Sequence, residues 1–286
     1  MTLAIEQKFE VDTQDCPGCN LGKVYSVQNT WWTPTNPGYG PGVMIERRGW
    51  DVVSCDNGGT PGLAEDQVLT RYYFILPGGT EVELRDKLTD GKPLKNVGVP
   101  NRCTDVHTQE RGTEFVAADG SGMTFQLDSV FADATQTYIS VHSQDQRGGS
   151  GYLRFRDGTA YRIVLGSVMW IQDRNGNRIT FEYDGQGRVV RITDSLLRVF
   201  EVSYASGTQA YDQISQKVGD VHKRLIKIHK GSHAAAANRV DGSGAPTFDQ
   251  LFPQSELNNH LLSPIPRATP FTPDIVTGVE MPNGQS

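Results

Sequence analysis

Apolar and polar residues alternate along much of the chain, and a glycine marks where many alternations begin. The recurring unit is a glycine, two variable residues, an apolar residue, one further residue and a second apolar residue. A period of two is typical of a strand with one buried and one exposed face. The unit begins at Gly79, Gly122, Gly158, Gly176 and Gly187. The pattern therefore predicts a series of short strands.

Turn-forming residues stand just before these glycines, as at Asp157, Asn175 and Asp184. Asp and Asn tolerate a left-handed backbone and accept hydrogen bonds from nearby amides, and glycine adopts positive φ without steric cost. Residues 152–165 are predicted to form one hairpin. A two-residue loop would put Phe155 and Tyr161 on opposite faces, so we expect a three-residue loop, 157–159, which puts them on one face.

The best internal match has an offset of 21 residues. A repeat unit of about 20 residues that holds one hairpin cannot bury its own apolar face, so it must stack on its neighbours. Gly176 aligns with Leu197, so the second copy lacks the glycine. The three apolar positions Ile179, Phe181 and Tyr183 align with Phe200, Val202 and Tyr204.

We therefore expect an all-β chain whose antiparallel hairpins form a twisted, curved sheet. Three regions are predicted: a strand-rich N-terminal region over 1–105, hairpin repeats over 106–231, and a long loop with the start of a further repeat over 232–286. Residues 231–273 show little periodicity and many breakers, with one short helical turn expected near 247–252.

Composition agrees with short strands and many turns. The 286 residues include 31 glycines against 15 prolines, and 37% are apolar. The formal net charge of −6 lacks the basic footprint that nucleic-acid binding needs, so no nucleic-acid partner is expected. No apolar run approaches about 18 residues, so no membrane insertion is expected.

Both ends of the chain carry signals about its context. The start, MTLAIEQKFEVD, has no charged leader followed by an apolar stretch, so we expect no signal peptide within this chain. The end, VTGVEMPNGQS, stops after a Pro-Asn-Gly turn signal, where the second strand of a hairpin is expected. We interpret the chain as a fragment of a longer protein.

The segment FEYDGQGRVVRITD, residues 181–194, resembles the YD-repeat core of rearrangement-hotspot (RHS) proteins. That core is Tyr-Asp, two variable residues and Gly-Arg-Leu. Tyr183, Asp184, Gly187 and Arg188 match it, and Val189 replaces the leucine. The resemblance is specific over about 170–205, and the earlier hairpins share only its rhythm.

Physical roles can be assigned to this motif. We expect Tyr183 to end a strand with its ring inward, Asp184 to accept hydrogen bonds in the turn, and Gly187 to supply a permissive backbone. Arg188 is close enough in sequence to pair with Asp184 or to cover the tyrosine ring. A catalytic aspartate is the alternative, but Asp184 aligns with Ala205 in the next copy, so we favour structural repetition, with Tyr204 as the second motif tyrosine.

The resemblance implies both a fold and a function. In RHS proteins many repeats wind into a large hollow β-shell around a cargo, often a toxic C-terminal domain. It implies a non-enzymatic structural segment, a partial shell or scaffold, of a large secreted or cell-surface bacterial protein. The expected partners are the rest of the parent protein or its cargo, and no cofactor is expected. We identify neither the family's self-cleavage region nor a toxin domain in the sequence.

A carbohydrate-binding β-module is the alternative function. Trp31, Trp32 and Tyr39 cluster among turn formers, and aromatic rings in loops can stack on sugars. YD-repeat proteins have also been linked to glycan binding, so these residues form a candidate glycan platform. We favour the simpler interpretation that one or both tryptophans anchor the N-terminal core.

The four cysteines leave four alternatives open: a redox motif, a zinc site, disulfides or free thiols. Cys16 and Cys19 have the spacing of a redox motif or a zinc knuckle. A strand-like sequence follows them, whereas a redox site needs a helix. Zinc usually needs two close pairs of ligands, and Cys55 and Cys103 are isolated from each other. In an exported protein of this kind we prefer the disulfides Cys16–Cys19 and Cys55–Cys103, and in a cytosolic one free thiols.

Other motifs predict no metal site and no enzyme. Asp173, Asn175, Asn177 and Asp184 partly imitate a calcium loop, but Arg178 stands where that loop requires glycine. The sequence HKGSH, residues 229–233, spaces two histidines by four, yet its glycine and serine favour a solvated turn. No nucleophile elbow, phosphate-binding loop or zinc-protease motif is present.

Overall fold

The structure is a computed structural model, which describes residues 9–15, 23–29, 40–56, 61–77, 80–95, 108–134, 146–218, 221–232 and 274–282. Every regular element in these ranges is a β-strand, and all the strand pairs are antiparallel. The predicted all-β class is confirmed. Within these ranges no helix has the length and apolar character that crossing a membrane requires.

The described strands form a two-stranded sheet and a 16-stranded sheet. The small sheet pairs β1 (Phe9–Asp15) with β2 (Lys23–Asn29). The large sheet contains β3 (Val43–Asp56), β4 (Pro61–Ile75), β5 (Glu81–Asp86), β6 (Leu94–Lys95), β7 (Thr108–Ala117), β8 (Thr124–Ala134), β9 (Gln146–Arg147), β10 (Gly151–Arg154), β11 (Ala160–Val164), β12 (Ser167–Gln172), β13 (Arg178–Tyr183), β14 (Val189–Asp194), β15 (Val199–Ser203), β16 (Tyr211–Val218), β17 (Val221–Ser232) and β18 (Asp274–Glu280).

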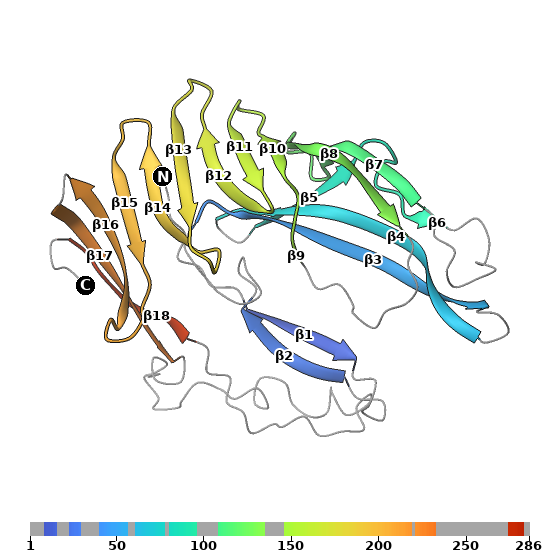
Figure 1. Ribbon diagram of the computed structural model, residues 1–286, viewed down its shortest axis with the longest axis horizontal. Helices are drawn as coiled ribbons and strands as arrows, with labels where there is room; N and C mark the ends of the chain where they lie inside the picture. The colour runs from blue at the N-terminus through green and yellow to red at the C-terminus, as the bar shows by residue number, and fades with distance from the viewer. Residues whose placement is uncertain are drawn as a thin grey trace.

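Part of the large sheet closes on itself. The strands follow the order β3-β4-β5-β7-β8-β10-β11-β12, and β12 then pairs with β3 through Ser167 and Val43. The amide of Met44 donates to the carbonyl of Gly166 at 2.8 Å, which continues this closing contact. Figure 1 shows the long strands β3 and β4 crossing beneath β10–β12. The curved sheet that the sequence predicts is therefore a closed ring with further strands attached.

Glycines allow the ring to close tightly. Gly149 has a φ of 77°, and a Cβ there would lie 3.0 Å from ring carbons of Phe125 and Tyr72. A Cβ on Gly151 would lie 2.1 Å from the carbonyl oxygen of Gln126. A larger side chain at Gly151 therefore cannot fit between β10 and β8 without moving the backbone.

The interior of the ring is filled by its own apolar side chains. Phe74, Phe115, Phe125 and Leu153 are completely buried there. The ring of Tyr72 meets that of Phe115 edge-on at 4.9 Å, the geometry that aromatic pairs prefer. The cluster continues along the repeats to Phe181, Val189 and Ile192.

Beyond the ring the sheet runs on as successive hairpins from β13 to β18, at the left of Figure 1. Each strand pairs with the next one in the chain, so pairing is local as far as β17, whereas β18 begins at Asp274, far along the chain from Ser232 at the end of β17. A second buried cluster lies on these strands and contains Val202, Tyr204, Ile214 and Ile228.

Two details of the predicted hairpins differ in the structure. The 152–165 hairpin has a three-residue loop, and Phe155 and Tyr161 share a face with ring centroids 4.8 Å apart. The loop is 156–158 instead of 157–159, because the amide of Phe155 pairs with the carbonyl of Thr159. The predicted solvated turn at 229–232 is wrong, since these residues continue β17 and pair with β18.

The large sheet draws strands from all three predicted regions, and the boundaries proposed for those regions remain predictions. The helical turn expected near 247–252 lies outside the described residues.

Candidate functional site

The Asp184 turn joins β13 to β14. Oδ1 of Asp184 accepts hydrogen bonds from the amides of Gln186 and Arg188, both at 2.9 Å. Oδ2 accepts one from Nε of Arg188 at 2.8 Å. The amide of Gly187 donates to the carbonyl of Asp184, and its φ of 74° is one that glycine adopts without strain. Both carboxylate oxygens are therefore engaged in holding the turn.

The same turn recurs at two other aspartates. Asp173 and Asp194 each accept the amides of the residues two and four positions later, at 2.8 to 3.0 Å. Nε of Arg198 donates to Asp194 at 2.6 Å, and Nδ2 of Asn177 takes the equivalent place on Asp173 at 2.8 Å. Each turn thus consists of an aspartate, three further residues, and a fifth residue whose amide and side chain both donate to the aspartate.

These contacts favour the ionised carboxylates. The side-chain hydrogen bond from Asn177 is the main cause that lowers the pKa of Asp173, and that from Arg198 lowers the pKa of Asp194. Partial burial opposes ionisation of Asp184, but hydrogen bonds from Arg188 and Gln186 outweigh it and lower the pKa. A carboxylate with a lowered pKa and occupied oxygens is a poor general base.

Leu197 occupies the left-handed position that Gly176 and Gly187 occupy in the other two turns. Its φ is 61°, against 88° at Gly176 and 74° at Gly187. Its side chain is 82% exposed, so no packing compensates for the strained backbone. The 21-residue alignment of Gly176 with Leu197 thus joins two positions of the same geometry despite the change of residue.

Each repeat tyrosine donates a hydrogen bond to the preceding strand. The hydroxyl of Tyr183 lies 2.7 Å from the carbonyl oxygen of Val168, and that of Tyr204 lies 2.9 Å from the carbonyl oxygen of Val189. Both acceptors are 15 residues earlier. The donors and the acceptors therefore repeat with the same offset of 21 residues.

Arg188 connects one repeat to the next. It forms an ion pair with Asp184, and its guanidinium lies over the ring of Tyr204, 4.1 Å from the centroid. The tyrosine that it covers belongs to the following repeat, and the sequence had suggested Tyr183. A guanidinium over an aromatic face is attracted by the ring quadrupole, so this contact adds to the stacking between repeats.

The turn after Tyr204 is built differently, because Ala205 stands where the earlier copy has Asp184. Oδ1 of Asp212, from β16, accepts the amide of Ala205 at 2.7 Å. Asp212 is buried and is paired with Nζ of Lys230 at 2.5 Å. The buried carboxylate of Asp212, paired with a partly exposed lysine from the neighbouring strand, therefore stands where the turn lacks its own.

A buried polar cluster around Arg111 was not predicted. Nε of Arg111 donates to Asp133 at 2.6 Å, and Nη1 donates to Thr89 at 2.6 Å and lies 3.7 Å from Asp86. Asp133 also accepts the amide of Thr70 at 3.1 Å. No regular spacing in the sequence predicts these contacts, because the register between β7 and β8 shifts at two positions.

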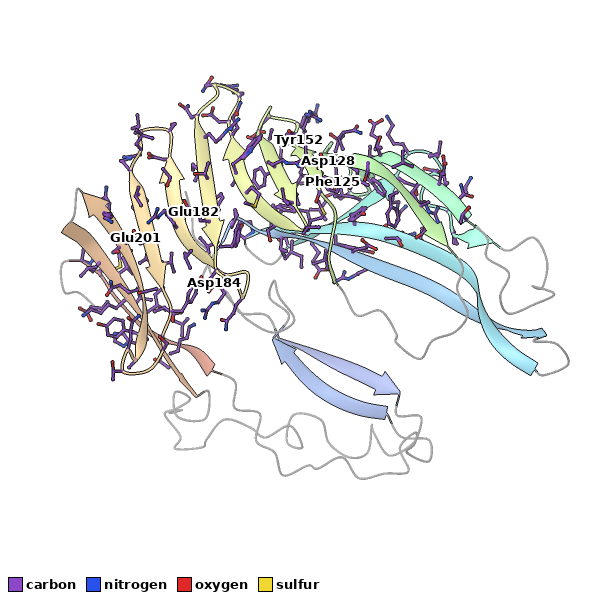
Figure 2. The ribbon with its side chains drawn as sticks, viewed as in Figure 1. Phe125, Asp128, Tyr152, Glu182, Asp184 and Glu201 are labelled. Carbon is purple, nitrogen blue, oxygen red and sulfur yellow. The ribbon has the colours of Figure 1, made fainter. Side chains whose placement is uncertain are left out.

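A shallow hollow of about 330 Å³ lies over β13–β16. Its charged side chains form a ladder, in which Arg191 lies 4.0 Å from Glu182 and 3.2 Å from Glu201. Lys217 lies 3.8 Å from Glu201. Figure 2 marks Glu182 and Glu201 on this part of the sheet. Because Arg191 lies between the two carboxylates, the hollow carries a surface ion-pair network and not an acid–base pair.

The imitation of a calcium loop does not assemble. Asp173 and Asp184 lie at opposite ends of β13, and each is engaged in its own turn. Across the residues that the structure describes, no cluster of three or more His, Cys, Asp or Glu side chains could hold a metal ion.

Several predicted residues cannot be placed. Cys16, Cys19 and Cys103 lie outside the described residues, and Cys55 lies on β3 with its side chain not described. The candidate glycan platform of Trp31, Trp32 and Tyr39 also lies outside them. The cysteine pairing and this platform therefore remain predictions.

Comparison with known families agrees with the repeat geometry. A family model described as RHS Repeat matches residues 171–197. The matched segment contains the Asp173 and Asp184 turns, β13 and β14, and the Asp194 turn up to Leu197. No curated protein matches the chain. Residues 171–197 are thus similar to the RHS repeat, in the part of the chain where the sequence resembles it most specifically.

Proposed function

We propose that the chain is a non-enzymatic structural segment, whose stacked hairpins form part of the wall of a larger RHS-type shell. The observation that carries this proposal is the hydrogen bond from each repeat tyrosine to the strand before it. Asp184 and Arg188 likewise bond to their own turn and to the next repeat. The motif residues thus contact the fold itself.

The parent protein is proposed to be a secreted or cell-surface bacterial protein, with the remainder of that protein or its cargo as partner. The closed ring is packed with its own side chains, so a cargo would lie outside the ring. The large sheet includes β13–β18 beyond the ring, and these hairpins are the part that could extend a wall.

Limited proteolysis of the parent protein tests the proposal. Asp184→Ala combined with Asp194→Ala should open two successive turns and make the wall, and any cargo that it encloses, more sensitive to protease. Asp157→Ala is the control, since Asp157 holds one turn through the amide of Thr159 with no partner arginine in that turn. The proposal would be contradicted if the double variant of the parent protein kept its protease resistance but lost a catalytic activity of this segment.

A further inference from the structure

Two adjacent leucines, Leu196 and Leu197, stand exposed in the turn between β14 and β15. The Asp173 turn forms the same backbone hydrogen bonds with Asn175 and Gly176 at the equivalent positions. The turn geometry therefore needs neither leucine, and Leu197 adds the strain of a left-handed backbone. An exposed apolar pair that weakens its own turn indicates a contact surface and not a structural role.

A guanidinium stands beside the two leucines. The side chain of Arg198 is 57% exposed, and its Nε donates to Asp194 at 2.6 Å. A guanidinium carries several N–H donors, so Arg198 can donate to a second carboxylate while it holds the turn. We call residues 196–198 the leucine tip, an apolar pair followed by a positive charge.

The hollow over β13–β16 has the complementary features. It lies where β14 and β15 stop pairing, because its lining includes Arg191 and Glu201, the last paired residues of that ladder. Val190 and Val202 supply its apolar lining. The side chain of Glu182, which also lines it, is 61% exposed and lies 4.0 Å from Arg191, the limit of an ion pair. The hollow thus offers apolar contact beside a weakly paired carboxylate.

We propose that the leucine tip of one copy of this chain docks in the hollow of a second copy, and that the two copies form a two-fold symmetric dimer. The leucines cover Val190 and Val202, and Arg198 pairs with Glu182 of the other copy. Figure 1 shows the turn at the upper end of β14 and β15, and Figure 2 marks Glu182 and Glu201 below it. Two such hairpins packed antiparallel place each tip on the other's hollow, so both contacts form at once.

The charges of the turn favour a second copy over a lipid surface. Asp194 and Arg198 place opposite charges in the same turn, so the turn has no net charge that would attract it to anionic lipid. Two leucine side chains are also a small anchor, since even a single long acyl chain gives only marginal membrane binding. A second copy instead offers valine side chains and a carboxylate within one hollow.

Sedimentation equilibrium of the intact chain at rising concentration tests this contact, and a monomer–dimer equilibrium is expected. Leu196→Asn/Leu197→Gly gives the tip the residues of the Asp173 turn, which keeps the turn geometry. This variant should weaken the dimer at least about tenfold, since two apolar side chains lose their contact. Leu165→Gly is the matched control, because Leu165 is also exposed and left-handed, with a φ of 46°, but lies between β11 and β12. Its dimer should be unchanged.

A double-mutant cycle tests the pairing of Arg198 with Glu182. Arg198→Asn removes the charge but keeps a donor to Asp194, as Asn177 provides on Asp173. Arg198→Asn and Glu182→Gln should each weaken the dimer about threefold to tenfold, because the two-fold axis repeats the pair. The double variant should lose no more than either single variant, since all three lose the same contact. Additive losses would show that the two residues do not pair.

Each other outcome decides against the contact. A chain that stays monomeric up to about 1 mM overturns the proposal, and so does a dimer that Leu196→Asn/Leu197→Gly leaves intact. An equal loss of affinity in Leu165→Gly would indicate nonspecific association of exposed leucines. Growth beyond the dimer would indicate head-to-tail contacts, which a closed two-fold pair excludes.

Discussion

Tyr204 donates a hydrogen bond to the carbonyl of Val189 at a distance of 2.9 Å, just beyond the point where β14 and β15 stop pairing. The last paired residues of this ladder are Arg191 and Glu201, so Val189 lies two residues beyond the last paired residue of β14. The ladder of β12 and β13 likewise ends at Trp170, and Tyr183 then bonds to Val168. In both repeats the tyrosine hydroxyl therefore adds a hydrogen bond between neighbouring strands beyond the end of their ladder.

Removal of either hydroxyl should therefore lower stability. Tyr204→Phe is expected to cost about 1–2 kcal/mol, because it removes a buried hydrogen bond, and Tyr183→Phe, whose hydrogen bond is partly buried, about 1 kcal/mol. Urea unfolding of each variant measures the change. Tyr152→Phe is the control, since that ring lies on the exposed face, and its stability should not change. Equal stability of all three variants would contradict the role given to the hydroxyls.

Asp184→Ala should destabilise the chain by about 2 kcal/mol, since one ionised carboxylate holds two amides and a guanidinium. This exceeds the cost of about 1 kcal/mol expected for a single turn hydrogen bond. Asp184→Asn keeps an acceptor oxygen and should lose less. Chemical denaturation of both variants ranks them, and the reverse order would show that the charge and its bonds are not what matters.

The repeat could be predicted because its signals are local. Asp184, Gly187 and the alternation around them lie within one turn and two strands, and the 21-residue offset aligns Gly176 with Leu197, which share a left-handed backbone. The shared face of Phe155 and Tyr161 also follows from loop length alone.

The rest depends on contacts between distant segments. Ring closure pairs Ser167 with Val43, and no periodicity links two strands so far apart. The pairing of Arg111 with Asp133 depends on the irregular register of β7 and β8, which local propensity does not determine. Residue 229 was expected in a turn because glycine and serine follow it, but pairing with β18 overrides that preference.

Arg111→Met should destabilise the chain by about 3–5 kcal/mol, because it leaves Asp133 and Asp86 buried without their cation. Arg162→Met is the control, since this arginine pairs with the exposed Asp128, and exposed pairs contribute little. Denaturant unfolding compares the two. If Arg111→Met were as stable as Arg162→Met, the buried cluster would not be needed for the fold.

Stability should fall in acid as the turn aspartates gain protons. The pKa values of Asp173, Asp184 and Asp194 are lowered from the ordinary value of 3.8. Their contribution is therefore present above the unfolded value and is lost as the pH falls through the lower, folded values. Urea unfolding from about pH 7 to about pH 3 measures this. Asp184→Asn should show a shallower decline, and an unchanged decline would exclude that carboxylate as a source.

Leu197→Gly should stabilise the chain, because it removes a left-handed strain from a side chain that packs against little. A left-handed residue with a Cβ costs about 1–2 kcal/mol, and the added freedom of glycine in the unfolded chain offsets about half. We expect a net gain of about 0.5–1 kcal/mol by urea unfolding. Gly187→Leu should have the opposite effect and cost about 1–2 kcal/mol, since it introduces the same strain at a φ of 74°.

Leu196→Gly separates this backbone effect from the loss of an exposed leucine. Leu196 is 72% exposed, beside the 82% exposed Leu197, but its φ is not in the left-handed region. Glycine there relieves no strain and only loosens the unfolded chain, so stability should fall by a few tenths of a kcal/mol, about 0.5. Opposite signs for the two neighbouring substitutions follow only if the turn at Asp194 needs the left-handed backbone that glycine provides at 176 and 187. If both substitutions changed the stability in the same direction, the turn would tolerate leucine without strain.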